Sequence, residues 1–392
     1  MSLVLNTNLS SLVAQNSLTT SGSQLSTALQ QLSSGLRINT AADDAAGYAI
    51  VQGMTSQING INQAARNAND GVSLSQTASG ALTEIVNDLQ TMRDLAVQSL
   101  NATNSAADRA DLDAQFQQLK ADINSVASQT QFNGVNLLDG SFQGATFQVG
   151  ANAGQSITMA AIASAKASNL GQVYTAAGTD VTNATYTGAV KNGDVVTFTV
   201  AGVTTGQITL TGNQTTDLKT VAAAINQAVG SQGIVATVDS NGEAINLSST
   251  TSQTVAASFN LVSGTGTETL ATFGLAASNA ITTAGNTVNN ADVKTVDDSN
   301  LVLIQIDAAL QQLATTGAQL GAYQNRFQAA ITGLNTDSTN LSSARSQIQD
   351  TDYAQATSAL SKAQILQQAS TAMVAQANTI PQNILTLLQK LP

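Results

Sequence analysis

The sequence predicts a mainly α-helical protein, with long coiled-coil-like helical hairpins and a β-hairpin region from its two ends and an inserted α+β domain in its middle. The first observation is the uneven distribution of glycine: seven of the 29 glycines lie in 1–130, nineteen in 131–290 and three in 291–392. The second is that proline occurs only at positions 381 and 392. The third is apolar periodicity, which is helical at the ends and alternating in the middle. Two helix-compatible ends therefore flank a turn-rich centre.

The N-terminal part carries three helical stripes. The first is a short heptad pattern. The second begins at Ile50 and predicts one helix over 45–100, roughly 80 Å long at 1.5 Å per residue. The third predicts a helix over 112–126. The heptad leucines are Leu18, Leu25 and Leu32, with Leu29 and Leu36 offset by four.

The C-terminal part mirrors this arrangement. One stripe runs over 306–341 and another over 348–388, each with apolar residues three or four positions apart. A helix of this length with a narrow Ala/Leu stripe cannot bury itself alone. The sequence therefore predicts partners for these helices, from the same chain or from neighbouring copies.

The centre changes its period. Asn133-Gly134 between apolar residues is a strong hairpin signal, and ATFQVG and SITMAAI read as short strands. From about residue 172 the chain alternates in DVVTFTVAG, QITLTG and IVATVDSNGEAINLSS, with one helix-like segment at 218–230. We expect a separate α+β domain here, and a return to helix at about Val293.

Composition narrows the class of function. The net charge is −11, and the 13 basic residues are scattered singly, which argues against nucleic acid and against a polybasic membrane patch. The chain has no Cys and no His, which excludes disulfides, thiolate sites, Ser-His-Asp triads and HExxH zinc sites. Carboxylates, Lys and Tyr could still catalyse, but we expect no enzyme, no cofactor and no metal. With only 9% charged residues, packing against copies of itself costs little desolvation.

The sequence shows neither an apolar membrane span nor an ordinary secretory signal. No apolar run approaches the ~18 residues of a membrane span. The first basic side chain is Arg37, so the N-terminus lacks the basic region of an ordinary secretory signal. We expect a chain that stays in the cytoplasm or leaves by a route without signal cleavage.

The stretch SGLRINTAADDAAG, residues 34–47, separates the heptad from the long helix. Its Asp43 and Asp44 could be a catalytic pair, a metal site or helix caps. The Thr40-x-x-Asp43 spacing resembles a capping box, and carboxylates favour a helix N-terminus, so we favour caps at a hinge that also includes Gly35.

Two features of the C-terminal part leave alternatives open. For Asp350 and Asp352 we expect capping or intersubunit polar contacts, since calcium needs more oxygen ligands than these two provide. Pro381 either kinks the last helix or begins a new segment.

Both ends resemble bacterial flagellin. The N-terminal matches are NTNLSSL, SGLRINTAADDAAG, ARNANDGVSL, TMRDLAVQS and QTQFNGV, and the C-terminal ones are IDAAL, LGAYQNRF, NLSSARSQIQDTDYA, KAQILQQAS and ANTIPQNILTLL. They cover roughly 1–170 and 293–392 in the family's order. LKTVAAAIN followed by IVATVDSNGEAINLSS resembles the flagellin insertion module.

The resemblance implies a secreted subunit of the extracellular flagellar filament, exported unfolded and polymerised beneath a cap. It divides the chain into an N-terminal inner-tube helix (1–44), a rod part with the hairpin (45–171), an outer domain (172–292), a second rod part (293–347) and a C-terminal inner-tube helix (348–392). The implied partners are further copies of the chain, an export chaperone, the filament cap, hook–filament junction proteins and the host's flagellin-sensing toll-like receptor.

The resemblance also assigns residues to these roles. The receptor motif has Arg and Glu where this chain has Thr91 and Gln115, while Leu95 is retained, so we expect weakened sensing. The inner-tube and polymerisation seam comprises Leu18, Leu25, Leu29, Leu32, Leu360, Leu366, Met373 and Leu388. The chaperone candidates are Ile365, Leu366, Ile380, Ile384, Leu385 and Leu388.

Other functions receive less support. A hook–filament junction protein shares such terminal helices, but should agree less closely over ARNANDG, FNGV and QNIL. A surface-adhesive module needs a sugar-stacking platform, and the middle has few aromatics. Ser/Thr-rich turns such as TGNQTT are either O-glycosylated or ordinary solvated turns.

Overall fold

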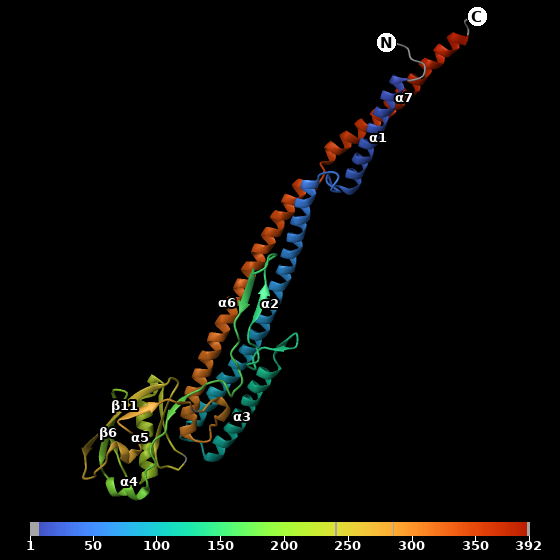
Figure 1. Cartoon of the computed structure of the whole chain (residues 1–392). Helices are drawn as coiled ribbons and strands as arrows, with labels where there is room; N and C mark the ends of the chain where they lie inside the picture. Colours follow the sequence, from blue (N-terminus) through green and yellow to red (C-terminus); the bar gives the residue numbers. More distant parts are fainter. Residues whose placement is uncertain (1–7, 240, 285, 390–392) are drawn as a thin grey trace. The chain divides into compact units, whose positions relative to one another are not determined.

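The computed structural model describes residues 8–239, 241–284 and 286–389, without the side chains of 283, 284 and 380–389. The chain forms two compact units. The first comprises Met1–Ala68, Gln148–Ser156 and Ala329–Pro392, and the second Asn69–Phe147 and Ile157–Gln328. The five-segment division made from the sequence stays a prediction. A mainly helical chain with an inserted β-rich region is confirmed (Figure 1).

The first unit is built from four helical pieces. Helix α1 (Leu9–Ser34) lies beside α7 (Tyr353–Gln389), as Figure 1 shows. The unit also holds the start of α2 (Ala45–Ser99) and the end of α6 (Val296–Gln349). The long helix predicted over 45–100 is confirmed. Within this unit Ile61 and Ala64 of α2 pack against Leu334 of α6.

The apolar stripe of α2 is shifted at its start from the predicted one. Ile50 was predicted to open the stripe, but its side chain is 51% exposed, whereas Val51 is 2% exposed. From Ile58 onward most predicted positions are buried, but Ala65, Val72 and Ala81 are only half-buried. Periodicity alone leaves a choice between two adjacent β-branched residues, and the partner helix decides it.

The helical part of the second unit also contains α3 (Ala106–Gln129). This helix begins with a capping box formed by Ser105 and Asp108. The predicted hairpin follows as β1 (Gln131–Phe132) and β2 (Val135–Asn136), with positive φ at Asn133 (49°) and Gly134 (79°). Two positive φ values at the turn match the type I′ geometry that Asn-Gly favours. The two further strands expected here pair as β3 (Ala145–Gln148) and β4 (Ser156–Met159).

Large side chains fill the space between α2, α3 and α6. Phe116, Ile123, Ile85 and Phe327 are fully buried. Gly71 makes this packing possible, because a Cβ there would lie 2.6 Å from Phe327 Cζ. The Phe327 ring also contacts Phe147 edge-on at 5.2 Å between ring centroids. The core therefore depends on one helical glycine that admits an aromatic ring.

The inserted region, residues 172–292, forms two antiparallel sheets and two helices. One sheet has the order β13-β5-β10-β9, and the other β12-β11-β6-β7, with β8 also paired to β6. The helices are α4 (Asn183–Ala189) and α5 (Gln214–Val229), with short turns η1 (Gly230–Gln232), η2 (Leu270–Phe273) and η3 (Val288–Asn290). The strands are β5 (Tyr174–Ala176), β6 (Val195–Val200), β7 (Val203–Thr204), β8 (Ile208–Thr209), β9 (Ile234–Val238), β10 (Ile245–Ser249), β11 (Gln253–Ser263), β12 (Ser278–Ile281) and β13 (Thr283–Ala284).

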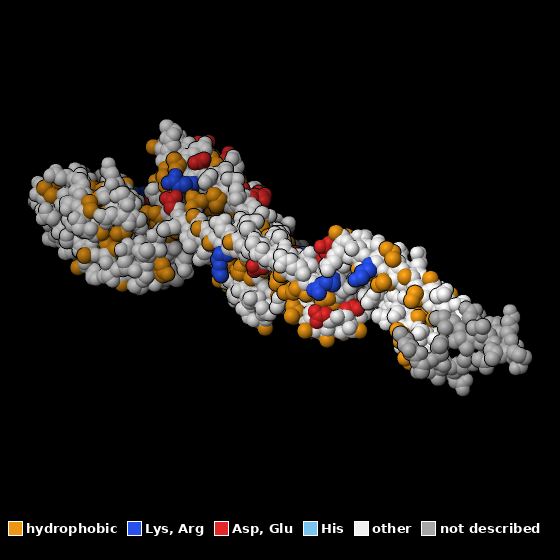
Figure 2. Space-filling model, turned by 90° about the horizontal axis from the view of Figure 1, so that it is seen from above, with side chains coloured by type: hydrophobic (Ala, Val, Ile, Leu, Met, Phe, Trp, Pro, Cys, Tyr) orange, Lys and Arg blue, Asp and Glu red, His pale blue; other side chains and the backbone are white. Residues whose placement is uncertain are grey.

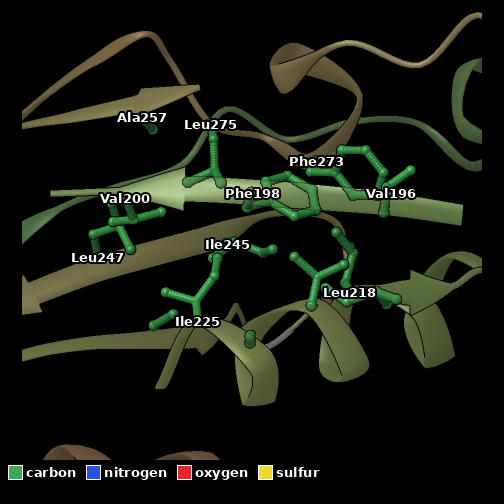
Figure 3. Packing of buried hydrophobic residues seen from close by; sticks show 14 of the residues in the cluster. Val196, Phe198, Val200, Leu218, Ile225, Ile245, Leu247, Ala257, Phe273 and Leu275 are labelled. Atoms are coloured by element: carbon green, nitrogen blue, oxygen red, sulfur yellow. The ribbon is translucent and has the colours of Figure 1, made fainter. Parts of the chain in front are cut away.

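This region has its own apolar core. Figure 3 shows Val196, Phe198 and Val200 of β6 facing Leu218 and Ile225 of α5, with the β10 side chains between them. The helix predicted at 218–230 is confirmed, and α5 begins four residues earlier at Gln214 because Asn213 caps it. The sequence did not predict α4 or the eleven-residue β11.

A buried carboxylate organises the turn before α5. Asp217 accepts hydrogen bonds from the backbone of Thr211 (2.7 Å) and Gly212 (2.9 Å) and from the Tyr186 hydroxyl (3.0 Å). Burial, and then the Asp217 charge, raise the pKa of Tyr186 well above its usual range. Charged acceptors form strong hydrogen bonds in such surroundings. Asp217, which belongs to α5, therefore links this helix to α4 and to the turn at residues 211–212.

Helix α3 holds the segment that leads from the inserted region back into α6. Buried Asp113 accepts a hydrogen bond from the Val293 amide (3.2 Å), and its other oxygen lies 3.4 Å from Lys294 Nζ. Thr295 then caps α6, because its hydroxyl accepts from the Asp298 amide at 3.0 Å. The predicted return near Val293 is confirmed, with α6 beginning at Val296.

Gly71→Ala will destabilise the second unit by about 1–3 kcal/mol, because the added methyl group overpacks the Phe327 ring. Urea unfolding of the full chain measures the change. Gly80→Ala on the same helix is the control: a Cβ there meets nothing within 4 Å, so it will stabilise the chain by roughly 0.5–1 kcal/mol. Equal effects of the two substitutions would contradict the packing described.

Candidate functional site: the terminal helix pair and its joint

The contact between α1 and α7 is a narrow line of mostly small side chains, which we name the α1–α7 seam. Its members recur at alternating steps of three and four, as in a coiled coil. Among the side chains that the structure describes, the buried ones are serines and alanines, namely Ser11, Ser21 and Ala28 on α1 and Ala356, Ala363 and Ala377 on α7. The half-buried ones are Ala14, Leu18, Leu25 and Leu32 on α1 and Leu360, Gln367, Ser370 and Val374 on α7.

Four of the predicted seam leucines lie on this line, namely Leu18, Leu25, Leu32 and Leu360. Leu29 does not lie on the α1–α7 seam, because its side chain is 50% exposed, and its part in a polymerisation seam stays a prediction. The heptad continues three positions after each leucine, at Ser21 and Ala28, and not four positions after it. Small side chains gave too weak an apolar signal for the sequence to show this.

Two of the remaining seam candidates lie outside the seam. Leu366 is 40% exposed and Met373 62% exposed, so neither belongs to the α1–α7 seam, and Ile365 is 66% exposed. Ile380, Ile384, Leu385 and Leu388 belong to α7, but their side chains lie outside the described residues. Pro381 also falls inside α7, so no new helix begins there.

Seven large apolar side chains of this helix pair remain exposed outside the seam, and we name them together the outer apolar face. On α1 its most exposed members are Leu9 (70%), Val13 (60%) and Leu12 (54%). Residues 9–34 contain no charged side chain, and residues 353–379 contain only Lys362. In Figure 2 the part of the molecule next to the grey residues is accordingly orange and white. Its members are Leu9, Leu12, Val13, Leu29, Ile365, Leu366 and Met373.

The joint after α1 is held by hydrogen bonds between the two ends of the chain. Gly35 adopts the left-handed conformation (φ 70°) that ends α1, and its carbonyl accepts from the Thr351 amide at 2.9 Å. Leu36 pairs with Asp350 in an antiparallel bridge. The Arg37 amide donates to the Gln349 carbonyl at 2.6 Å, and its guanidinium donates to the Ile348 carbonyl. Backbone groups that would otherwise face solvent are thus satisfied across the joint.

One apolar side chain fills the joint. Ile38 is 1% exposed, although it lies in a polar stretch. Sequence reasoning missed Arg37, Ile38 and Gln349. An isolated isoleucine between polar residues was the only available signal, and its partner lies more than 300 positions away.

The two aspartates of SGLRINTAADDAAG have different roles. Asp44 is the N-cap of α2, because its carboxylate accepts from the Gly47 amide at 2.9 Å and its carbonyl from the Tyr48 amide. The carboxylate of Asp43 accepts from the amides of Asn39 (3.0 Å) and Thr40 (2.9 Å), one turn earlier. These bonds, that from Thr40 above all, lower the pKa of Asp43.

The predicted Thr40–Asp43 capping box of α2 is therefore wrong. The α2 cap is one residue later, at Asp44, and the Thr40–Asp43 pair closes the preceding turn. Near the other break, Asp352 caps α7 by accepting from the Ala354 amide at 2.9 Å. Asp350 accepts from the Ser346 hydroxyl at 2.6 Å. All four carboxylates are engaged with the chain itself.

The three receptor-contact positions lie on α2 and α3 of the second unit. Thr91 and Gln115 are exposed. Leu95 is 9% exposed and packs in the core. Its assignment as a receptor-contact position stays a prediction.

Together these features define a class: a fibrous structural subunit whose terminal helices are only half covered within the chain. Within the described residues no helix is long and apolar enough to cross a membrane. Large exposed apolar patches in general mark interaction surfaces.

Comparisons with known proteins agree with this class. The family model for the bacterial flagellin N-terminal helical region matches residues 5–143, and that for the C-terminal helical region matches 303–388. Flagellin B of Vibrio anguillarum is 37% identical over 390 residues, covering 99% of this chain and 100% of that protein. Flagellin of Salmonella typhimurium is 36% identical over 498 residues, with 99% and 100% covered.

The chain belongs to the bacterial flagellins, and it is a structural subunit of the flagellar filament. Among solved structures, FliC from Burkholderia pseudomallei is similar with 25% identity, a TM-score of 0.40 and coverage of 65% of this chain and 99% of that one. The flagellins are a family of structural proteins.

Asp44→Ala will destabilise the first unit by about 1 kcal/mol, because the Gly47 amide loses its acceptor at the start of α2. Asp44→Ser keeps an N-cap oxygen and will stay close to the natural chain. Urea unfolding gives the free energies, and amide exchange over 45–50 shows whether the loss is local. If Asp44→Ser costs as much as Asp44→Ala, the capping role is wrong.

Proposed function

We propose that the α1–α7 pair is the assembly element of the filament, and that neighbouring copies cover its outer apolar face. The observation that carries this proposal is that two features occur together in the helix pair. Its buried seam residues are small, and seven large apolar side chains outside the seam are exposed. Each large apolar side chain that becomes buried contributes roughly 1.5–3 kcal/mol. Because α1 has no charges, burial of this face requires little desolvation of ions.

The same balance explains why we propose that the terminal helices become ordered on assembly. Fixing the backbone costs roughly 1–2 kcal/mol per residue. The buried members of the seam are serines and alanines and its leucines are only half-buried, so the seam recovers only part of this cost. The remainder comes from the outer apolar face once it is covered. In this proposal 1–44 and 348–392 are the inner-tube segments.

Export and its partners are part of the proposal. The chain contains no Cys, which agrees with passage through a narrow channel in an unfolded state. Before assembly an export chaperone would cover the C-terminal apolar residues, of which Ile365 and Leu366 are exposed. The filament cap and the hook–filament junction proteins would meet the same helices. The product would be an extracellular filament without catalytic activity.

Weakened sensing by the host receptor also remains a proposal. Thr91 and Gln115 are both exposed. Because both side chains are uncharged, the surface of α2 and α3 carries no charge at these two positions. A guanidinium and a carboxylate in these places would supply charge-assisted hydrogen bonds, which are about twice as strong as neutral ones.

Met373→Gln will raise the critical concentration for seeded elongation roughly tenfold or more, because a side chain of similar length no longer gains from burial. Electron microscopy and sedimentation of filaments grown from short seeds measure this. The free monomer will unfold as before, since Met373 is 62% exposed.

Val262→Thr is the matched control for that experiment. It also removes an exposed apolar side chain (42%), but on β11, which is not part of the helix pair. Normal elongation is expected. If Met373→Gln elongates as well as Val262→Thr, the outer apolar face is not an assembly surface.

Thr91→Arg combined with Gln115→Glu will raise receptor activation by purified monomer, on the order of tenfold if two charge-assisted contacts are regained. A reporter-cell dose–response curve measures the half-maximal dose. Thr83→Arg, at an exposed threonine on the same helix, is the control and will leave the dose unchanged. Full potency of the unaltered monomer, matching a typical enteric flagellin, contradicts the proposal.

A further inference from the structure

Two carboxyl groups meet in the outer region, between the start of β6 and the loop that follows β11. Asp194 is 2% exposed and Glu268 is 7% exposed. Their side chains are within hydrogen-bonding reach of each other. Neither belongs to the apolar core of this region. Two buried carboxylates in contact repel strongly, so this arrangement requires a compensating group.

Asp194 already has its partners. Its Oδ1 accepts from the Thr265 amide at 3.1 Å and its Oδ2 from the Lys191 amide at 2.7 Å. These N–H groups stabilise the charged form of Asp194 and lower its pKa together with the bond to Glu268, which has the largest effect. Asp194 is therefore the ionised member of the pair.

Within the described part of the chain, the carboxyl group of Glu268, unlike that of Asp194, lacks such donors from other residues. Among the described residues no donor from another residue forms a hydrogen bond with either of its carboxyl oxygens when both acids are ionised. A proton on Glu268 changes this, since its O–H then donates to Asp194. Burial, followed by the bond to Asp194, raises the pKa of Glu268 to about 7.

The loop fits closely around the pair because it contains two glycines. A Cβ at Gly264 would lie 2.1 Å from Asp194 Oδ1. A Cβ at Gly266 would lie 2.2 Å from Glu268 Oε1 and 2.4 Å from Asp194 Oδ2. The loop is anchored again by the Thr267 amide, which donates to the Ala189 carbonyl at 2.9 Å. Loop 264–268 therefore closes directly over both carboxyl groups.

We propose that Asp194 and Glu268 form a proton-dependent latch, in which one shared proton holds loop 264–268 closed over the start of β6. When the proton leaves to solvent, the Glu268–Asp194 hydrogen bond is replaced by repulsion between two carboxylates, and the loop opens. The closed state thus belongs to acidic and neutral surroundings and the open state to alkaline ones.

The charged groups around the pair support a proton over a metal cation. Lys191, on the segment after α4, is the nearby cation and lowers the pKa of Glu268 slightly. Tyr186 of α4 and Asp217 of α5 bond to each other. The described residues of β8, β11 and η2 carry no titratable side chain. The Asp194 oxygens face amide N–H groups, which would repel a cation.

The sign of the pH effect follows from these shifts. Glu268 binds a proton more tightly in the closed loop than in the open one, so closure is favoured at low pH. This contribution is complete below the ordinary glutamate pKa and is lost as the pH rises through about 7. The lowered pKa of Asp194 acts only in more acidic solution, where closure weakens again.

Amide hydrogen exchange of the full-length monomer at pH 5 and pH 8 tests the latch. The protection factors of Thr265 and Thr267, corrected for intrinsic exchange, will fall on the order of 10–100-fold between these pH values. Glu268→Gln will abolish the difference, because its amide donates to Asp194 at both pH values. Glu243→Gln, in the same region, is the control and will keep the difference.

A second measurement avoids any substitution. The side-chain carboxyl carbon of Glu268, followed by NMR in the natural sequence, will titrate well above the usual glutamate range and near pH 7. An ordinary midpoint overturns the proposal, as does pH-independent protection of the loop. It is also overturned if Glu268→Gln keeps the natural pH dependence, or if millimolar Ca²⁺ restores protection at pH 8.

Discussion

The α1–α7 seam is the constraint on which the rest of this protein depends. Its buried members are serines and alanines, which let two helices approach closely but bury little apolar area. Some larger side chains, such as Leu12 and Met373, lie outside the seam and are exposed. The helix pair therefore leaves apolar surface exposed within the chain, and in the proposed assembly neighbouring copies cover it.

The joint shows how a chain can change from one helix pair to another without losing backbone hydrogen bonds. The two breaks cross at Leu36 and Asp350 and satisfy each other's carbonyl and amide groups. Helix caps at Asp44 and Asp352 restart the helices on the other side. The carboxylates that looked like a possible active site serve this structural purpose.

The inserted region follows a different principle. It has a core of its own between α5 and two sheets, and Asp217 ties its turn and helices together. It contacts α6 through Val173, Val235 and Ile304. Because its core is local, the proposed opening of loop 264–268 would leave the α1–α7 seam unchanged.

The sequence by itself determined the long helices, the Asn-Gly hairpin and the inserted region, because helical and strand periods are local properties of the chain. It also placed Leu18, Leu25 and Leu32 on one face. It misplaced the α2 cap, and it missed the small seam residues, α4 and β11. Small side chains and adjacent aspartates give ambiguous local signals.

Tertiary structure decided what no local pattern contains. Which of Ile50 and Val51 is buried depends on the partner helix. Arg37 and Ile38 find their partners at Ile348 and Gln349, far along the chain. The same holds for Asp194 and Glu268, whose proximity depends on the pairing of β6 with β11. Such contacts are set by how distant segments come together, and sequence spacing does not encode that distance.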